Sequence, residues 1–498
     1  MTTWVVWVHD RQNLDRVTEM STKNVRQLDE LLVSTTEVKV GQIIGDSKVK
    51  ISDITHDSSK VSLGAIFCCV VGENADGHNF ANVAVANGAV ALLVERRVEV
   101  DVTQVVVSDV RSAMGYIAAE LFNRPSQKMN VIGVTGTNGK TTTAHLLAAI
   151  LQQHGWSTSI IGTLTGSRTT PESTDLQRHL ANEHDRGCKA VVMEVSSHAL
   201  TLRRVEGTSF KVAVFTNLGQ DHLDFHKSQE DYFAAKASLF DKKFTEVCVI
   251  NRDDVHGSLL IDSLSKNNDV QCQTFGADDA HSVVASSEKI SFIWQGQKIE
   301  VGMGGYFNVM NALAAATAAA KLGVTAGDIA KGLAAASAVA GRFESVNVGQ
   351  NFSVIIDYAH TPEALQNVLV ATRQLISGTA RIILVFGCGG GRDQSKRPKM
   401  GSVAAKFADV ALITSDNPRH EDSQKIADEI LAGAQDQTQN MKIQLDRRQA
   451  IATAFSSANA GDIVVIAGKG HETTQTIGAT EMPFNDSEVS RELLKVAS

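Results

Sequence analysis

The stretch Gly133-Val134-Thr135-Gly136-Thr137-Asn138-Gly139-Lys140-Thr141 decides the fold of the central part of the chain. An apolar run of strand length, residues 131–135, leads into it, and a segment with apolar residues on one helical face follows. Glycines in such a turn let backbone N–H groups converge on phosphate oxygens at the positive end of the helix. Lys140 can neutralise terminal phosphates, and the Thr141 hydroxyl suits Mg²⁺. The stretch predicts a phosphate-binding loop on an α/β sheet.

The match to a phosphate loop is a variant one. The strict pattern places its first glycine six residues before the lysine, where this chain has Val134. Glycine-rich turns that bind no nucleotide are common, but here strand, Gly-Lys-Thr and helix occur in the right order. We therefore expect ATP to bind at Gly136, Thr137, Asn138, Gly139, Lys140, Thr141 and Thr142.

Length and composition bound the class of protein. At about 100 to 200 residues per domain, 498 residues predict about three domains. With 43% hydrophobic residues and only 6 prolines, the chain is typical of globular proteins. Lys plus Arg is 47 and Asp plus Glu is 55, a net charge of −8, so nucleic acid is not an expected partner. The six cysteines show no C-x-x-C spacing, which favours reduced thiols in the cytoplasm.

The N-terminal residues show no export or membrane signal. Residues 4–8 are apolar but run into His9, Asp10 and Arg11, far short of the roughly 20 residues of a membrane span. Met20 precedes the first amphipathic segment. We interpret residues 1–19 as either a frayed leader or a misassigned start.

Turn-forming residues and changes of pattern along the chain predict three parts, residues 1–126, 127–345 and 346–498. Pro125 disfavours helix at the preceding residue, so a helix through 116–122 should end there. The alanine-rich stretch 311–340 retains regular large apolar residues, which favours packed helices over low-complexity disorder. A hairpin is expected around residues 295–297.

The third part repeats one pattern, in which an apolar run of strand length is followed by a glycine or an acidic residue. Strands that alternate with helices form a parallel, doubly wound sheet, and ligands bind beyond the carboxyl ends of its strands. The residues at these ends are Asp357, Gly387, Asp416 and Gly468. The third part is therefore predicted to be a Rossmann-like substrate domain.

Two polar clusters follow strands of the central part. Glu194 ends the apolar run that begins at residue 190, and a carboxylate there can hold Mg²⁺ beside the phosphate loop. Residues 221–226 follow the next predicted strand and carry two histidines. We predict that His222 is a site residue, while His226 equally fits a structural role.

Lys236 lies in an amphipathic helix for which Ser228 is the predicted N-cap. It shares a face with Tyr232 and Phe240, so its amine should point inward. Burial lowers the pKa of a lysine and leaves a neutral amine that can take up CO₂ as a carbamate. The alternative is a packed stem with the ammonium reaching water, and the residues alone favour that alternative.

The order of four segments resembles that of the Mur ligases, the ATP-dependent amide-forming enzymes of peptidoglycan synthesis. These are Gly-Thr-Asn-Gly-Lys-Thr at 136–141, Glu-Val-Ser-Ser-His at 194–198, the cluster at 216–226 and Ala-Ala-Lys-x-x-Leu-Phe at 234–240. The resemblance covers about residues 45 to 490. It implies that Lys236 is carbamylated, and that two Mg²⁺ ions are held by Thr141, Glu194, His222 and the Lys236 carbamate. It further implies that Asn308 and Asn311 meet adenine, that Arg342 reaches the nucleotide, and that Asp357 belongs to a segment that closes on ATP.

The resemblance also implies the first substrate, UDP-N-acetylmuramoyl-L-Ala-D-Glu. Thr169, Thr170, Ser196 and Arg204 resemble the residues of the branch that accepts it, with Arg204 as a two-pronged partner for carboxylates. Asp57 and Ser58 resemble part of its uridine-binding boxes. This chain departs from the pattern at Ser59, where Arg is usual, and at Glu73-Asn74, where His-Gln is frequent.

The second substrate implied is meso-diaminopimelate, because Asp-Asn-Pro-Arg at 416–419 marks the ligases that add it and lysine-adding relatives usually lack that Arg. Its second amino acid group needs a cation, for which Arg419 and Arg392 are candidates, and an acceptor, for which Glu472 is the candidate. Alone, Asn417-Pro418 would fit a simple turn. The expected site comprises Arg392, Asp416, Asn417, Arg419, Gly468 and Glu472.

The expected reaction is phosphorylation of the D-Glu side-chain carboxylate by ATP, followed by attack of the meso-diaminopimelate amine on the acyl phosphate. Lys140, His222, Lys236 and the metal ions would neutralise charge. We expect a bacterial cytoplasmic monomer that serves cell-wall biogenesis, and so cell shape and division. Alternatives are a lysine-adding ligase, a folylpolyglutamate-synthase-like ligase, and a nucleotide switch without ligase chemistry.

Overall fold

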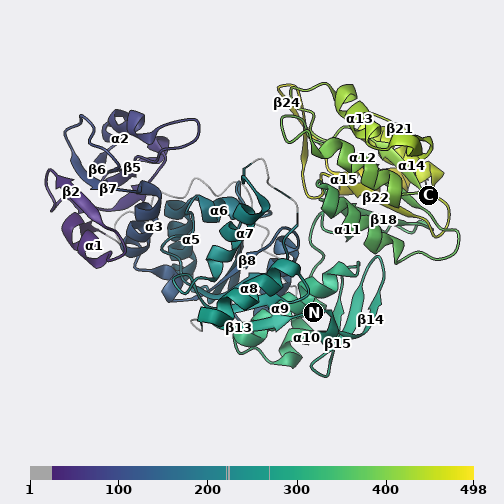
Figure 1. Ribbon diagram of the computed structural model, residues 1–498, viewed down its shortest axis with the longest axis horizontal. Helices are drawn as coiled ribbons and strands as arrows, with labels where there is room; N and C mark the ends of the chain where they lie inside the picture. The colour runs from purple at the N-terminus through teal and green to yellow at the C-terminus, as the bar shows by residue number, and fades with distance from the viewer. Residues whose placement is uncertain (1–24, 220, 222–224, 268–269, 498) are drawn as a thin grey trace. The chain divides into compact units, whose positions relative to one another are not determined.

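The computed structural model describes residues 25–219, 221, 225–267 and 270–497 (Figure 1). The chain forms two compact units. The first contains the described residues up to Met129 together with Pro171–Gly187 and Ala199–Ser209, and the second contains the rest. The interpretation of residues 1–19 as a leader or misassigned start lies outside the described residues.

The first unit is built on a five-stranded sheet with the order β2-β7-β6-β5-β4. Helix α3 (Val110–Leu121) packs beside α5 (Ser173–Asp185), which the chain contributes from a later segment. The predicted end of a helix before Pro125 is confirmed at Leu121. The remaining elements are β1 (Arg26–Gln27), α1 (Leu28–Ser34), β2 (Val40–Ile44), β3 (Lys50–Ile51), β4 (Asp53–Thr55), β5 (Ala65–Cys68), α2 (Ala81–Ala86), β6 (Ala89–Val94) and β7 (Thr103–Val107).

The second unit begins with a six-stranded parallel sheet of order β13-β12-β11-β8-β10-β9. β8 (Asn130–Thr135) lies inside the sheet and leads through the glycine-rich loop into α4 (Lys140–Gln153). The predicted parallel sheet with a strand, loop and helix at this position is confirmed. The other strands and flanking helices are β9 (Thr158–Ile161), β10 (Ala190–Glu194), β11 (Phe210–Phe215), α7 (Gln229–Ala237), β12 (Thr245–Asn251), α8 (Val255–Asn267) and β13 (Gln271–Phe275). The residues of α6 (Ser197–Thr201) are divided between the two units.

The alanine-rich stretch forms two packed helices, α9 (Phe307–Lys321) and α10 (Ala326–Ala335), and both contact α4. Small alanine side chains let these helices approach closely, and those of α9 are almost all buried. The predicted hairpin is also confirmed. It joins β15 (Ile290–Trp294) to β16 (Gln297–Val301), with a further strand β14 (His281–Ala285), and its two turn residues both have positive φ, as a type I′ turn requires.

The C-terminal sheet has the order β17-β18-β22-β19-β20-β21 and is parallel except at β17 (Glu344–Ser345). Its core strands are fully apolar because both faces are covered, and two separate hydrophobic clusters fill the two faces. The predicted doubly wound sheet is confirmed. Its elements are β18 (Ser353–Asp357), α11 (Pro362–Arg373), β19 (Ile382–Phe386), α12 (Lys396–Phe407), β20 (Val410–Ile413), α13 (Ser423–Ala432), β21 (Met441–Ile443), α14 (Arg447–Ser457), β22 (Ile463–Ala467), β23 (Thr474–Ile477), β24 (Thr480–Pro483) and α15 (Asp486–Ala497). Helices α11, α12 and α13 lie side by side (Figure 1).

Within the described part of the chain, no helix is both long enough and apolar enough to cross a bilayer.

Candidate active site

Lys140, the first residue of α4, makes hydrogen bonds back to the phosphate loop that precedes it. Its Nζ donates to the carbonyl oxygens of Gly136 and Thr137, both at 2.8 Å. Burial lowers the pKa of this amine, and Glu194 opposes that shift. The Lys140 ammonium therefore lies over the loop at the N-terminus of α4, where terminal phosphates are expected to bind.

The loop is held by Asn217, which follows the neighbouring strand β11 and which the sequence analysis placed in a polar cluster without assigning it a role. The backbone N–H of Asn138 donates to Asn217 Oδ1 at 2.9 Å, and Asn217 Nδ2 donates to the Asn138 carbonyl at 3.1 Å. The Thr137 hydroxyl forms a hydrogen bond with the Tyr232 hydroxyl at 3.0 Å. These contacts fix the loop conformation from both sides.

Glu194 ends β10 beside the start of α4 and is 1% exposed. Thr141 Oγ1 donates to Glu194 Oε2 at 2.9 Å, and the Thr163 backbone N–H donates to Oε1 at 2.9 Å. The structure thus brings together the hydroxyl and the carboxylate predicted to hold Mg²⁺. His222, the third predicted ligand, lies outside the described residues.

Lys236 points inward from α7, whose predicted N-cap Ser228 accepts from the Asp231 backbone N–H at 3.1 Å. The lysine is 1% exposed, and Nζ donates to the Gly136 carbonyl at 2.8 Å and lies 4.7 Å from the centre of the Tyr232 ring. Burial holds the pKa of this amine well below its ordinary value, and the nearby Lys140 lowers it further. The prediction of an inward amine is confirmed, and the alternative of an ammonium reaching water is wrong.

Asn308 and Asn311 lie on the first turns of α9 and are both buried. Asn308 Nδ2 donates to the Gly304 carbonyl at 2.7 Å, and Asn311 Nδ2 donates to Asn308 Oδ1 at 2.8 Å. Asn311 lies directly against Gly139, because a Cβ built at that glycine would stand 2.3 Å from Asn311 Oδ1. The first turn of α9 therefore packs on the phosphate loop.

We predict that Gly139→Ala destabilises the protein by more than backbone strain alone explains. Gly139 has a φ of +84°, so alanine pays about 1–2 kcal/mol for the left-handed conformation and must also displace Asn311. Its free energy of unfolding, measured in urea, should fall further than that of Gly155→Ala, and its ATP affinity should fall roughly 10- to 100-fold. Gly155 is a matched control at the other end of α4, with a φ of +89° and no atom within 4 Å of a built Cβ. Equal losses in the two variants would contradict the packing argument.

Arg342 and Asp357 meet near the start of the C-terminal sheet. Arg342 Nη2 donates to Thr141 Oγ1 at 3.3 Å, and its guanidinium lies 4.7 Å from the centre of the Tyr358 ring. Asp357 accepts from the backbone N–H groups of Phe343 at 2.7 Å and Ala359 at 2.8 Å. Burial raises the pKa of Asp357, and Arg342 opposes that shift. Asp357 thus fixes the backbone that presents Arg342.

The predicted residues for the first substrate fall in both units. In the second unit, Thr170 Oγ1 donates to the Glu194 carbonyl at 2.9 Å and accepts from the Ser196 backbone N–H at 3.1 Å. Thr169 Oγ1 forms a hydrogen bond with Thr163 Oγ1 at 3.0 Å. These threonines and Ser196 therefore surround the end of β10, beside the phosphate loop.

In the first unit, Arg204 is paired with Glu172, its Nε lying 2.8 Å from Oε1. Arg111 contacts the same carboxylate at 3.3 Å, a pairing that the sequence analysis missed. A carboxylate ligand bound by Arg204 would thus meet a second arginine nearby.

Asp57 and Ser58, which resemble part of the uridine-binding boxes, lie at the start of a short turn in the first unit. Asp57 Oδ1 accepts from the backbone N–H of Ser59 at 3.0 Å and from its hydroxyl at 2.7 Å. These bonds lower the pKa of Asp57. Ser59, which departs from the family pattern, therefore stabilises this turn.

At the carboxyl edge of the C-terminal sheet, the predicted diaminopimelate residues come together. Asn417 Nδ2 donates to Glu472 Oε2 at 2.7 Å, and Arg419 Nη1 donates to the Gly390 carbonyl at 2.6 Å. Asp416 lies against Gly468, where a built Cβ would stand 2.7 Å from Asp416 Oδ2. Arg392 is exposed and directly follows the glycine-rich segment 387–391, which contains Gly390. Three segments far apart in sequence thus form one polar site.

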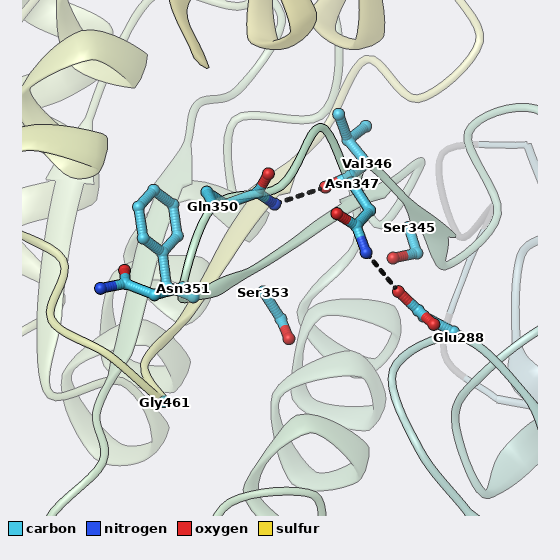
Figure 2. Close-up of a pocket in the computed structure, with 9 residues that line it drawn as sticks. Glu288, Ser345, Val346, Asn347, Gln350, Asn351, Ser353 and Gly461 are labelled. Carbon is cyan, nitrogen blue, oxygen red and sulfur yellow. Dashed lines mark hydrogen bonds between the residues drawn. The ribbon is translucent and has the colours of Figure 1, made fainter. Parts of the chain in front are cut away.

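A separate pocket of about 190 Å³ contains none of the predicted site residues (Figure 2). Asn347 Nδ2 donates to Glu288 Oε1 at 2.9 Å across it, and Gln350 Nε2 donates to the Val346 carbonyl at 2.8 Å. The side chains of Asn347, Glu288 and Gln350 are therefore already hydrogen-bonded within the protein.

Three family models match the chain: "Mur ligase family, catalytic domain" at residues 50–124, "Mur ligase middle domain" at 134–319 and "Mur ligase, glutamate ligase domain" at 341–470. A protein from Clostridioides difficile strain 630 is 43% identical over 469 residues, which is 90% of this chain and 96% of that one. The chain belongs to the Mur ligase family. That relative and one from Aquifex aeolicus, 42% identical over 89% of this chain and 94% of its own, are both named UDP-N-acetylmuramoyl-L-alanyl-D-glutamate--2,6-diaminopimelate ligase.

Solved structures agree on the three-domain Mur ligase architecture. One of a UDP-N-acetylmuramoyl-L-alanyl-D-glutamate--2,6-diaminopimelate ligase has a TM-score of 0.67 and 31% identity, covering 95% of this chain and 99% of that one. A MurF ligase from Thermotoga maritima in complex with ADP has a TM-score of 0.61 at 21% identity, covering 89% of this chain and 97% of its own. A folylpolyglutamate synthase from Mycobacterium tuberculosis has a TM-score of 0.57 at 17% identity, covering 70% of this chain and 91% of its own. The last two likenesses show the fold alone.

Proposed function

We propose that this chain is an ATP-dependent ligase that adds meso-diaminopimelate to UDP-N-acetylmuramoyl-L-Ala-D-Glu. ATP phosphorylates the D-Glu side-chain carboxylate, and the amine of meso-diaminopimelate attacks the acyl phosphate, so that an amide forms and phosphate leaves. We place this reaction in peptidoglycan precursor synthesis in the bacterial cytoplasm, carried out by a monomer.

The observation that carries the proposal is the polar site at the edge of the C-terminal sheet. Meso-diaminopimelate ends in a carboxylate and an ammonium, which need a cation and an anion at fixed separation. Arg419 is directed at the glycine-rich segment 387–391 by its bond to the Gly390 carbonyl, and Glu472 is held by Asn417. This pairing of opposite charges suits a second amino acid group better than the lone ammonium of lysine.

The phosphate loop supplies the other half of the reaction. Lys140 neutralises phosphate charge at the N-terminus of α4, and Arg342 approaches the same loop through Thr141. His222 is proposed to act here as well. Asn308 and Asn311 are proposed to meet adenine, and Thr169, Thr170, Ser196, Arg204, Asp57 and Ser58 to bind the UDP-linked substrate.

The residues beside the loop fit two Mg²⁺ ions and a carbamate. Thr141 and Glu194 offer hard oxygen ligands within 2.9 Å of each other, which suit Mg²⁺. The buried amine of Lys236 has the lowered pKa that reaction with CO₂ requires, and the carbamate would supply further oxygens. When bound, the metal ions would neutralise the charge that develops during phosphoryl transfer.

The experiment that tests the function is phosphate release from Mg-ATP in the presence of UDP-N-acetylmuramoyl-L-Ala-D-Glu, with meso-diaminopimelate compared with L-lysine. We expect release with meso-diaminopimelate and little with lysine. Preference for lysine would keep the ligase reaction but contradict the assignment of Arg419. Release that does not depend on either amino acid would favour a nucleotide switch.

A further inference from the structure

The C-terminal site contains a buried lysine that the reaction above does not use. Lys469 follows β22 and is 0% exposed. Its Nζ donates to Glu472 Oε2 at 2.9 Å and to Asn417 Oδ1 at 3.2 Å. Since Asn417 also donates to Glu472 Oε2, the three side chains form a closed triangle. One buried ammonium therefore contacts two of the residues proposed to bind the amino acid.

The triangle leaves one side of Glu472 open. Both donors reach the same oxygen, Oε2, and no hydrogen bond from the described residues reaches Oε1. The Glu472 side chain is 31% exposed, while that of Lys469 is fully buried. Lys469 thus holds the carboxylate through Oε2, which leaves Oε1 for a ligand ammonium.

The triangle also fixes Asn417 in the loop that carries Arg419. Asn417 Oδ1 accepts from Lys469 and from the backbone N–H of Thr476 at 3.0 Å. The Arg419 backbone N–H donates to the Thr476 carbonyl at 3.0 Å. Asn417 and the Arg419 backbone therefore share a second anchor, Thr476, which remains when Lys469 is replaced.

We propose that Lys469 is a positioning residue that determines recognition of the distal ammonium of the amino acid substrate by holding Glu472 and Asn417. It does not touch the substrate itself. A buried cation bound to a partly exposed carboxylate holds it in one orientation, which gives specificity rather than stability. This inference rests on the proposed function.

The test compares meso-diaminopimelate with 2-aminopimelate, which keeps both carboxylates but lacks the distal amine. For Lys469→Met, we expect the KM for meso-diaminopimelate to rise roughly 10- to 100-fold, the effect of losing a charge-assisted hydrogen bond. The KM for 2-aminopimelate, kcat and the KM for ATP should each change by less than about threefold, because those steps do not involve the distal ammonium. General damage to the site would instead raise both amino acid KM values together and would overturn the proposal.

A double-mutant cycle with Glu472→Gln shows whether Lys469 acts through Glu472. In the Glu472→Gln protein, adding Lys469→Met should raise the KM for meso-diaminopimelate by less than about threefold, since coupled residues are not additive. Additive effects would overturn the proposal. If Lys469→Met does not fold, the doubly apolar Lys469→Met/Glu472→Met protein should fold, because it leaves no unpaired charge. Failure of the double variant while Glu472→Gln folds would also contradict the pairing.

Arg381→Met is the matched control. Arg381 lies just before β19, at the amino edge of the same sheet, and pairs with Asp462 at 2.7 Å. This variant loses an ion pair of the C-terminal sheet and should leave both amino acid KM values unchanged. If the parent protein shows no amino-acid-dependent phosphate release, the proposed function fails and the role of Lys469 falls with it. If the parent is active and the cycle is additive, only the role of Lys469 fails.

Discussion

Lys236→Ala is expected to lower kcat for meso-diaminopimelate-dependent phosphate release roughly 10³-fold, the size of effect seen when one electrostatic group is removed from an active site. Lys236 is 1% exposed, and its Nζ lies 2.8 Å from the Gly136 carbonyl in the phosphate loop. Alanine removes the amine on which a carbamate would form. Steady-state phosphate release measures the loss, with Lys331→Ala as a control because that lysine is 69% exposed on α10.

Addition of chloride or bicarbonate should restore part of this activity, since a small anion can occupy the space of the missing carbamate. A Lys236→Ala protein with full activity in the absence of both anions would contradict carbamylation.

Replacement of Lys236 should not lower the stability of the protein as it lowers the activity. Burial lowers the pKa of Lys236, so at neutral pH the unfolded chain binds a proton that the folded amine disfavours, and folding is penalised. Lys236→Met removes this penalty. Its free energy of unfolding in urea, measured without bicarbonate, should equal or exceed that of the parent. A large loss would show that Lys236 is needed for packing.

The two parallel sheets of the second unit could be predicted because their strands are short apolar runs that end at glycines or at polar residues. It did not predict that Pro171–Gly187 packs with the first unit. That packing depends on contacts between distant segments, such as Arg178 Nη2 donating to the Ile54 carbonyl at 2.7 Å. A pattern within one segment contains no information about such a partner.

Residue type and position alone made Lys140 and Glu194 candidates, whereas Arg419 became one only through the resemblance of residues 416–419 to a family motif. Lys469 was missed because a lysine between two glycines has the pattern of an exposed loop residue. Its burial depends on Asn417, 52 residues away, and on Glu472. For Lys236, the apolar neighbours on one helical face predicted an inward amine, but the residues alone favoured an ammonium that reaches water, which the 1% exposure of the side chain contradicts.

Arg419→Ala is expected to lower kcat/KM for meso-diaminopimelate roughly 10²- to 10³-fold, the range for losing one partner of a desolvated charge pair. The loop backbone is held on both sides of this residue, by the Thr476 carbonyl and by the Gly478 N–H, and the guanidinium donates to Gly390 at 2.6 Å. Alanine therefore removes the charge while the loop stays in place. L-Lysine has no second carboxylate, so its kcat/KM should change less than about threefold.

Arg419→Lys should recover little of the lost activity, because a single ammonium cannot donate to Gly390 and to both oxygens of a carboxylate as a planar guanidinium does. Arg448→Ala is the control, since Arg448 is 49% exposed and pairs with Glu492 between α14 and α15. Competition between the two amino acids in one reaction gives the selectivity directly. Equal losses for both would mean that Arg419 supports the loop rather than recognises the carboxylate. No loss for either amino acid would assign recognition to Arg392, which follows the glycine-rich segment 387–391 at its exposed end.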